Sequence, residues 1–226
     1  MTITNIQTDS GHCKGLIASG PAAWATIRNQ SDADSIFAPW MMSEVKIAPM
    51  YSISRGVMTF DLTTIAPTET VDGVTLKAYL IGAGWDDLEI PHNYNYQCVV
   101  GANISTPIVV ANYNRASFSP TKYAERDYHF LNVWDTWYDF PFNVNGIAKV
   151  QAGLGAAGCG FAMIEGHDFD NVAPILGRDF GYFDAGTVPL PPPGANAPIL
   201  EITHHSGGPV IMGGGIGRRN REAKRY

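Results

Sequence analysis

The chain is dominated by short runs of β-branched and aromatic residues, each closed by Gly, Pro, Asn or Asp. Apolar and polar residues alternate within many runs, as in half-buried β-strands, while the 3.6-residue period of amphipathic helices is almost absent. We expect strands at residues 24–28, 43–48, 53–62, 74–81, 96–100, 107–111, 140–144, 160–164 and 199–203. So many short strands at near-regular spacing predict an all-β sandwich or barrel.

One segment favours a helix, residues 146–152 (GIAKVQA), with one or two turns. The proline-rich segment 188–198 is excluded as a central strand because proline donates no ladder hydrogen bond. A chain of 226 residues is long enough to bury a core of its own. We expect a single domain over residues 1–205, in which residues 1–30 could instead form an N-terminal arm. Residues 206–226 are predicted to form a glycine-rich, basic C-terminal arm.

Charge is unevenly distributed along the chain. Residues 218–226 carry a net charge of +4 and residues 1–217 carry −10, which gives the total of −6. The basic residues of this end are Arg218, Arg219, Arg221, Lys224 and Arg225, opposed only by Glu222. An acidic body is a poor general nucleic-acid binder, because phosphate contacts require basic side chains. We interpret the basic end as an assembly arm, with a solvated, solubilising tail as the alternative.

The three cysteines, Cys13, Cys98 and Cys159, are far apart and lack metal-ligand spacing. They are predicted to be small buried hydrophobes in a reducing compartment. The first residues lack the basic and apolar regions of a secretory signal, and no apolar stretch reaches the length of a transmembrane helix. We therefore expect a protein made in a cytoplasm, with no membrane partner.

Five segments, in order, resemble the signature motifs of the disaggregatase-related (DNRLRE) modules. They are SRGVMTFDLTTIAP (54–67), GVTLKAYL (73–80), FNVNGIAKV (142–150), GFAMIEGHDFDNVAP (160–174) and AGTVPLPPPGANAPILEIT (185–203). The resemblance covers roughly residues 30–204. It implies a jelly-roll β-sandwich of two antiparallel sheets, related to carbohydrate-binding modules and to structural proteins of tailed phages.

The chain departs from the secreted members of that family in two respects. It shows no export signal, neighbouring catalytic domain or tandem copy, and it carries a long insertion at residues 85–126. Arg55 and Asp61 match the family pattern. Their position there suggests structural roles, such as a buried ion pair, rather than catalysis.

Aromatic residues gather in residues 127–142 and in the insertion. Trp134, Trp137 and Tyr138 are predicted to form a platform for sugar rings or for a partner subunit, with Asp135 or Asp139 bonding hydroxyls. In the insertion, Trp85, Tyr94 and Tyr96 are candidates for the same glycan- or partner-binding surface. The alternative is that about half of these aromatics are core residues, because large aromatics dominate burial.

Two motifs permit a ligand interpretation. Residues 153–158 (GLGAAG) match the glycine pattern of dinucleotide sites, but a strand rather than a helix is expected after them, so we interpret them as a tight turn. Asp168, Asp170 and Asn171 could supply oxygen ligands to a structural calcium ion. A turn stabilised by their side chains is the alternative, and no other cofactor is expected.

Signatures of catalysis are missing. The sequence contains no HExxH, GxSxG or phosphate-binding loop. Asp86, Asp87 and Glu89 could form a glycosidase pair only at a defined separation across a cleft, which a sequence does not specify. The adjacent His204 and His205 would face opposite sides of a strand. We therefore expect a protein that is not an enzyme.

These features together predict a virion structural protein of a tailed phage: a capsid decoration, head-fibre or tail component. We expect it to be made in the host cytoplasm and located in the virion. Its partners would be other virion proteins, further copies of itself, with a trimer as one symmetric state, and surface polysaccharide; nucleic acid is disfavoured. The alternative is a stand-alone carbohydrate-binding module of a bacterial surface or polysaccharide-processing system, and a glycan-degrading enzyme is the third hypothesis.

Overall fold

The computed structural model describes residues 1–8, 12–37, 40–46, 50–84, 94–127, 131–174, 178–185 and 195–206. The strands are β1 (Thr2–Gln7), β2 (Cys13–Gly20), β3 (Ser35–Phe37), β4 (Trp40–Lys46), β5 (Tyr51–Phe60), β6 (Glu69–Gly84), β7 (Tyr96–Ala102), β8 (Phe118–Asp127), β9 (Thr136–Pro141), β10 (Cys159–Glu165), β11 (Arg178–Asp184) and β12 (Ile199–Ser206). The helices are α1 (Trp24–Arg28), α2 (Val144–Gly153) and α3 (Gly166–Asp170), with 3₁₀ turns η1 (Val110–Tyr113) and η2 (Arg115–Ser117).

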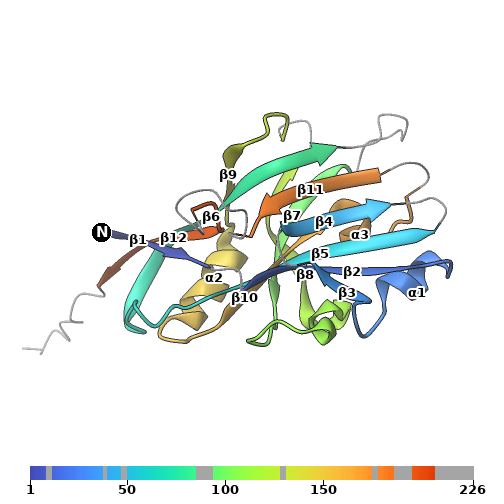
Figure 1. Ribbon diagram of the computed structural model, residues 1–226. Helices are drawn as coiled ribbons and strands as arrows, with labels where there is room; N and C mark the ends of the chain where they lie inside the picture. The colour runs from blue at the N-terminus through green and yellow to red at the C-terminus, as the bar shows by residue number, and fades with distance from the viewer. Residues whose placement is uncertain are drawn as a thin grey trace, which may run out of the picture.

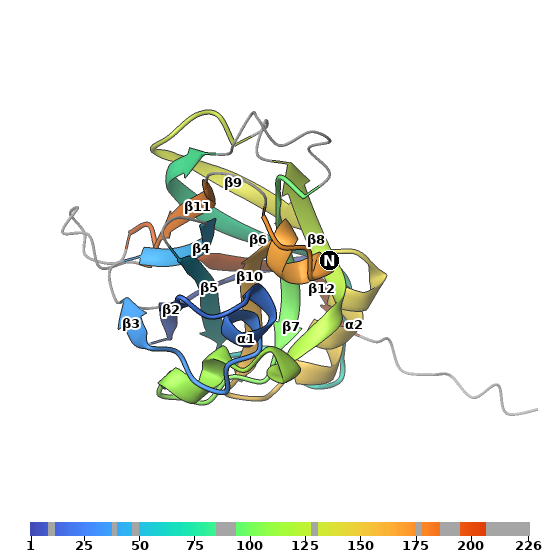
Figure 2. The same cartoon turned by 90° about the vertical axis from the view of Figure 1, so that its right-hand side faces the viewer.

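The fold is an all-β sandwich of antiparallel strands, as the strand pattern predicted. Pairing runs in the order β1-β12-β6-β11-β4-β5-β10-β7-β8, with β9 beside β6, β2 beside β5 and β3 beside β2. The strands wrap around a central core (Figures 1 and 2). One layer contains β2, β5, β10, β7 and β8, and the other contains β12, β6, β9 and β11. The pairing of β4 with β5 joins the two layers.

Two hydrophobic cores lie on opposite faces of the layer that contains β5, β10 and β7. The first core lies between the layers and includes Met58, Phe161 and Leu76. The second core lies on the outer face, where α1, η1 and the segment between β7 and β8 cover Val57 and Ala162. Strands buried on both faces lose strict alternation and become continuously apolar, which explains why this part of the sequence is so uniformly hydrophobic.

Two predicted strands are wrong. Residues 24–28 form α1, because Trp24 and Ile27, three positions apart, both pack into the second core. Such spacing belongs to a helix face, and five residues are too few to separate the two periods. The segment 107–111 runs into the 3₁₀ turn η1, where Val109 and Val110 are exposed.

One predicted strand ends at another residue, and several strands were not predicted. The predicted strand 140–144 is β9, which ends earlier because Asn143 caps the next helix. Strands β1, β2, β3, β8 and β11 were not predicted, and part of their sequence is too short, too polar or too rich in glycine for a clear pattern. Across the described segments, no helix is both long and apolar enough to cross a bilayer.

The predicted short helix is present as α2, and the GLGAAG segment is a turn between this helix and β10. Asn143 accepts hydrogen bonds from the amides of Asn145 and Gly146 at the helix start. Gly155 has a φ of 78°, and a Cβ atom there would lie 2.7 Å from Cγ of Pro67. In a dinucleotide site the glycine-rich turn follows a strand and leads into a helix, whereas here it follows a helix and leads into a strand. The glycines therefore allow a tight turn and do not form a dinucleotide site.

Replacing Gly155 by alanine should therefore destabilise the fold, by about 1–3 kcal/mol, because it adds a left-handed Cβ and a steric clash. Gly158→Ala is the matched control, since nothing lies within 4 Å of a Cβ at Gly158. Urea unfolding of both variants measures the difference. Equal stabilities would show that the turn tolerates a side chain at Gly155.

Candidate functional site

The largest fully buried side chain in the described part of the chain is that of Arg55, at the middle of β5. Its side chain is 0% exposed and points into the second core. Nε donates to Oδ2 of Asp168 at 2.6 Å, and Nη2 donates to Oδ1 at 2.7 Å. Nη1 and Nη2 also donate to the carbonyls of Tyr113 (2.6 Å) and Arg28 (2.7 Å). One guanidinium therefore joins β5 to α3, η1 and α1.

The charge of Arg55 is compensated on all sides. Burial alone would lower its pKa, but attraction and hydrogen bonding from Asp168 outweigh this and raise the pKa. Its Cζ also lies 4.1 Å from the ring centroid of Tyr113, a cation–π contact. Burial raises the pKa of the Tyr113 hydroxyl. With both charges paired, this cluster stabilises structure and offers no reactive group.

The expected buried ion pair thus involves Arg55, but its partner is Asp168 and not Asp61. Asp61 is exposed and accepts a hydrogen bond of 2.9 Å from the amide of Thr63, in the turn after β5. Hydrogen bonding from the side chain of Thr63, and then from its amide, lowers the pKa of Asp61, with a smaller contribution from His12.

The three residues considered as calcium ligands lie at α3 and have other partners. Both carboxylate oxygens of Asp168 face guanidinium groups. Asp170 accepts a hydrogen bond of 2.6 Å from the hydroxyl of Tyr96, and Asn171 ends the helix in the left-handed conformation. Within the described ranges, no three His, Cys, Asp or Glu side chains gather as a metal site. The carboxylates of Asp168 and Asp170 therefore join α3 to β5, α1 and β7, and among the described residues they do not bond to the backbone of a local turn as the alternative supposed.

The predicted aromatic residues separate into two groups. Tyr94 and Tyr96 lie beside α3, where the Tyr94 ring is 5.2 Å from that of His167 and Lys122 Nζ is 4.0 Å from the Tyr96 centroid. Burial, then the bond to Asp170, raises the pKa of Tyr96. These contacts are structural. Trp85 and the carboxylates Asp86, Asp87 and Glu89 lie outside the described residues, as do all five basic residues of the predicted arm.

Trp134, Trp137 and Tyr138 come together around β9. The side chains of Trp134 and Trp137 are 59% and 36% exposed, and the neighbouring Val133 is 58% exposed. Tyr138 is a core residue, whose hydroxyl accepts from the amide of Val133 (3.0 Å) and donates to its carbonyl (3.1 Å). We name the exposed residues Val133, Trp134 and Trp137 the β9 patch. Tyr138 fixes this patch from below.

An open hollow of about 550 Å³ adjoins the β9 patch and is lined by Arg126, Val133, Thr136, Trp137, Tyr138 and Asp139. Arg126 donates to the carbonyl of Asp139 at 2.9 Å, with its guanidinium 4.8 Å from the Tyr138 ring. Trp137 contacts Tyr79 of β6 edge to face, at 5.6 Å between centroids. The arrangement offers apolar surface beside fixed polar groups, suited to a protein surface or a sugar ring.

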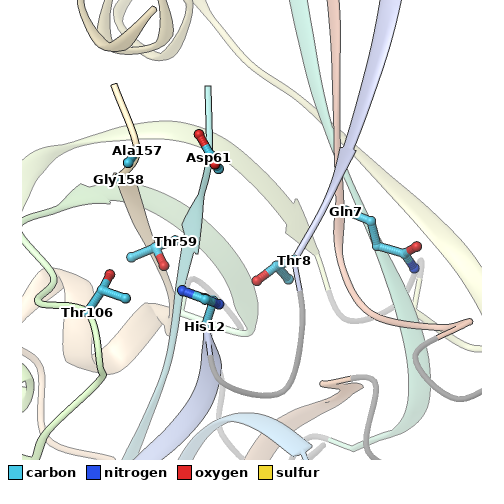
Figure 3. A pocket seen from close by; sticks show the side chains of 8 residues that line it. All are labelled: Gln7, Thr8, His12, Thr59, Asp61, Thr106, Ala157 and Gly158. Carbon is cyan, nitrogen blue, oxygen red and sulfur yellow. The ribbon is translucent and has the colours of Figure 1, made fainter. Parts of the chain in front are cut away.

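A second hollow, of about 560 Å³, lies where β1, β2 and β5 meet the turn before β10 (Figure 3). Its lining residues are Gln7, Thr8, His12, Thr59, Asp61, Thr106, Ala157 and Gly158. Sequence reasoning missed this site, because its residues come from five separate segments and form no local motif. The sequence singled out Asp61 and the GLGAAG turn, which supplies Ala157 and Gly158, but for other reasons and not as parts of one site.

The cysteines are buried free thiols, as predicted. Burial raises the pKa of Cys98 well above its ordinary value and that of Cys159 to about 11. Buried thiols without solvent access are poor nucleophiles, and the raised pKa values of Cys98 and Cys159 make these two poorer still.

Comparison with known proteins adds no assignment. No family model matches the chain, and no curated protein matches it. The resemblance to disaggregatase-related modules therefore stays a prediction.

Removing the Arg55 guanidinium should lower the stability of the fold far more than breaking a partly exposed ion pair. We expect Arg55→Met to lower the free energy of unfolding by about 3–5 kcal/mol, because the buried Asp168 loses both of its short charge-assisted hydrogen bonds and keeps only the longer contact with Arg28 (3.3 Å). The control is Lys77→Met, which breaks a partly exposed pair with Glu201 (2.7 Å) and should cost about 1 kcal/mol or less.

Chemical denaturation gives both values. Should Arg55→Met fail to fold, the double variant with Asp168→Leu removes both charges and should recover part of the loss. Similar losses for Arg55→Met and Lys77→Met would contradict the central role of the buried pair.

Proposed function

We propose that this protein is a non-enzymatic structural component of a tailed-phage virion, a capsid decoration, head-fibre or tail protein with jelly-roll connectivity. The observation that carries the proposal is the β9 patch, in which Val133, Trp134 and Trp137 expose large apolar side chains side by side in sequence. Exposed apolar surface with a polar rim marks interaction sites on soluble proteins, and buried tryptophans are frequent anchors of interfaces.

The contacts that hold the β9 patch in place support an adhesive role. The Tyr138 hydroxyl holds Val133 at both its amide and its carbonyl, and Tyr79 supports Trp137 from the neighbouring strand. A surface that is already ordered loses little conformational entropy when a partner covers it. We propose other virion proteins and further copies of this chain as partners, with a closed symmetric oligomer such as a trimer as the arrangement.

A carbohydrate-binding module is the second candidate, favoured by the polar groups beside the tryptophan. Lys77 and Asp139 are cross-strand neighbours, as are Tyr79 and Trp137. Lys77 donates to Glu201 at 2.7 Å. Aromatic rings flanked by charged hydrogen-bonding groups can hold a sugar ring by stacking and by bonds to its hydroxyls.

The double variant Trp134→Ala/Trp137→Ala should shift the solution mass from an oligomer to the monomer, because it removes the anchors of the interface. Light scattering over a concentration series measures this. Ile36→Ala, at an exposed apolar residue on β3, serves as the control and should leave the oligomer intact. If the wild type is monomeric and the double variant instead loses binding on a glycan array, the carbohydrate-binding candidate replaces the virion role.

Residues 207–226 lie outside the described part, and we propose that they form an assembly arm. A chain ending at Ser206 retains all of β12, including the 2.9 Å bond from Ser206 to Glu69. It should fold normally but assemble more weakly, most visibly at low salt where charge contacts are least screened. A full-length variant with the five basic residues changed to Gln should behave likewise. If both variants assemble as the wild type does, an assembly role for residues 207–226 is excluded.

A further inference from the structure

The polar hollow beside Thr59 shares no residue with the β9 patch and has its own chemistry. Its volume of about 560 Å³ lies within the range of small-molecule sites. Three threonine hydroxyls, an amide, an imidazole and a carboxylate line it, and Ala157 and Gly158 leave room on one side (Figure 3).

Two of these hydroxyls are buried without a partner. Thr8 and Thr59 are 7% and 3% exposed, and their Oγ1 atoms make no hydrogen bond within the part of the chain that the structure describes. Figure 3 shows both side chains next to His12, at the hollow. Buried hydroxyls are unfavourable unless something bonds to them. A ligand that carries hydroxyl groups would supply the missing partners, directly or through a bound water.

The charge of the lining selects the ligand class. Asp61 is the acidic group, and its lowered pKa, set first by the hydrogen bond from Thr63, keeps it ionised at neutral pH. No lysine or arginine is among the described lining residues. Phosphates and carboxylates need such cations, so the hollow disfavours nucleotides and acidic sugars despite the glycine-rich turn at its rim.

We propose that this hollow binds a neutral polyhydroxylated ring, namely a single neutral sugar residue. Its adjacent hydroxyls donate to the Asp61 carboxylate and exchange hydrogen bonds with Thr59 and Thr8. The described lining contains no Phe, Tyr or Trp side chain, so recognition rests on hydrogen bonds to a single ring and not on stacking along a chain. This inference does not depend on the adhesive role of the β9 patch.

The test uses the full chain and a panel of neutral sugars: glucose, galactose, mannose, fucose and N-acetylglucosamine, with glucuronate as the charged comparator. Saturation-transfer NMR should detect at least one neutral sugar, and calorimetry should give a dissociation constant in the millimolar range. Thr59→Val, which removes the hydroxyl at nearly constant volume, should weaken binding about tenfold, and Asp61→Asn at least as much. Thr59→Ser, which restores a hydroxyl, and Trp137→Ala, at the other site, should bind like the wild type.

Three outcomes would overturn the proposal. One is that no neutral sugar binds at millimolar concentration while the protein is folded. Another is that binding survives Thr59→Val but disappears in Trp137→Ala, which would assign it to the β9 patch. The third is that glucuronate binds as well as its neutral counterpart, which would contradict the selection by charge.

Discussion

The buried guanidinium of Arg55 organises the outer face of the sandwich. Arg28 and Tyr113 are the last residues of α1 and η1, so the two carbonyls that Arg55 bonds are helix-end groups with no intrahelical partner. Its counterion, Asp168, lies in the first turn of α3, where a negative charge is favourable. The Arg55 guanidinium therefore bonds the last carbonyl of two helical segments and neutralises the carboxylate in the first turn of a third.

This arrangement explains how such short elements can cover a sheet. Segments of four or five residues, such as η1, α1 and α3, do not form stable helices in water, because nucleation is unfavourable. Here the buried guanidinium and the apolar residues Ile27, Tyr113 and Phe118 supply the missing stabilisation. Because this cover occupies the outer face of β5, β10 and β7, the exposed surfaces of interest lie elsewhere, at β9 and beside the ends of β1 and β5.

The sequence predicted what local patterns determine. The all-β class, the apolar strands β5, β7 and β10 and the helix α2 follow from periodicity and capping within a few residues. The partner of Arg55 does not, because Asp168 is 113 positions away and the sequence offered the nearer Asp61. For the same reason the polar hollow, assembled from five segments, left no trace in the sequence. The aromatic cluster was half predicted: its position was right, but the sequence did not separate the core residue Tyr138 from the exposed tryptophans.

That separation is itself informative about function. Along β9, Tyr138 and Phe140 point inward, and Phe140 packs against Phe183 at 6.0 Å between centroids. The core is filled by these residues, so it does not require Trp134 or Trp137. Each exposed tryptophan keeps a large apolar area in water, which folding alone does not relieve. Trp134 is 59% exposed, so the fold gains little from its ring, whereas Trp137 also packs against Tyr79. This exposed apolar area is the surface that a partner would cover under the adhesive role proposed for the β9 patch.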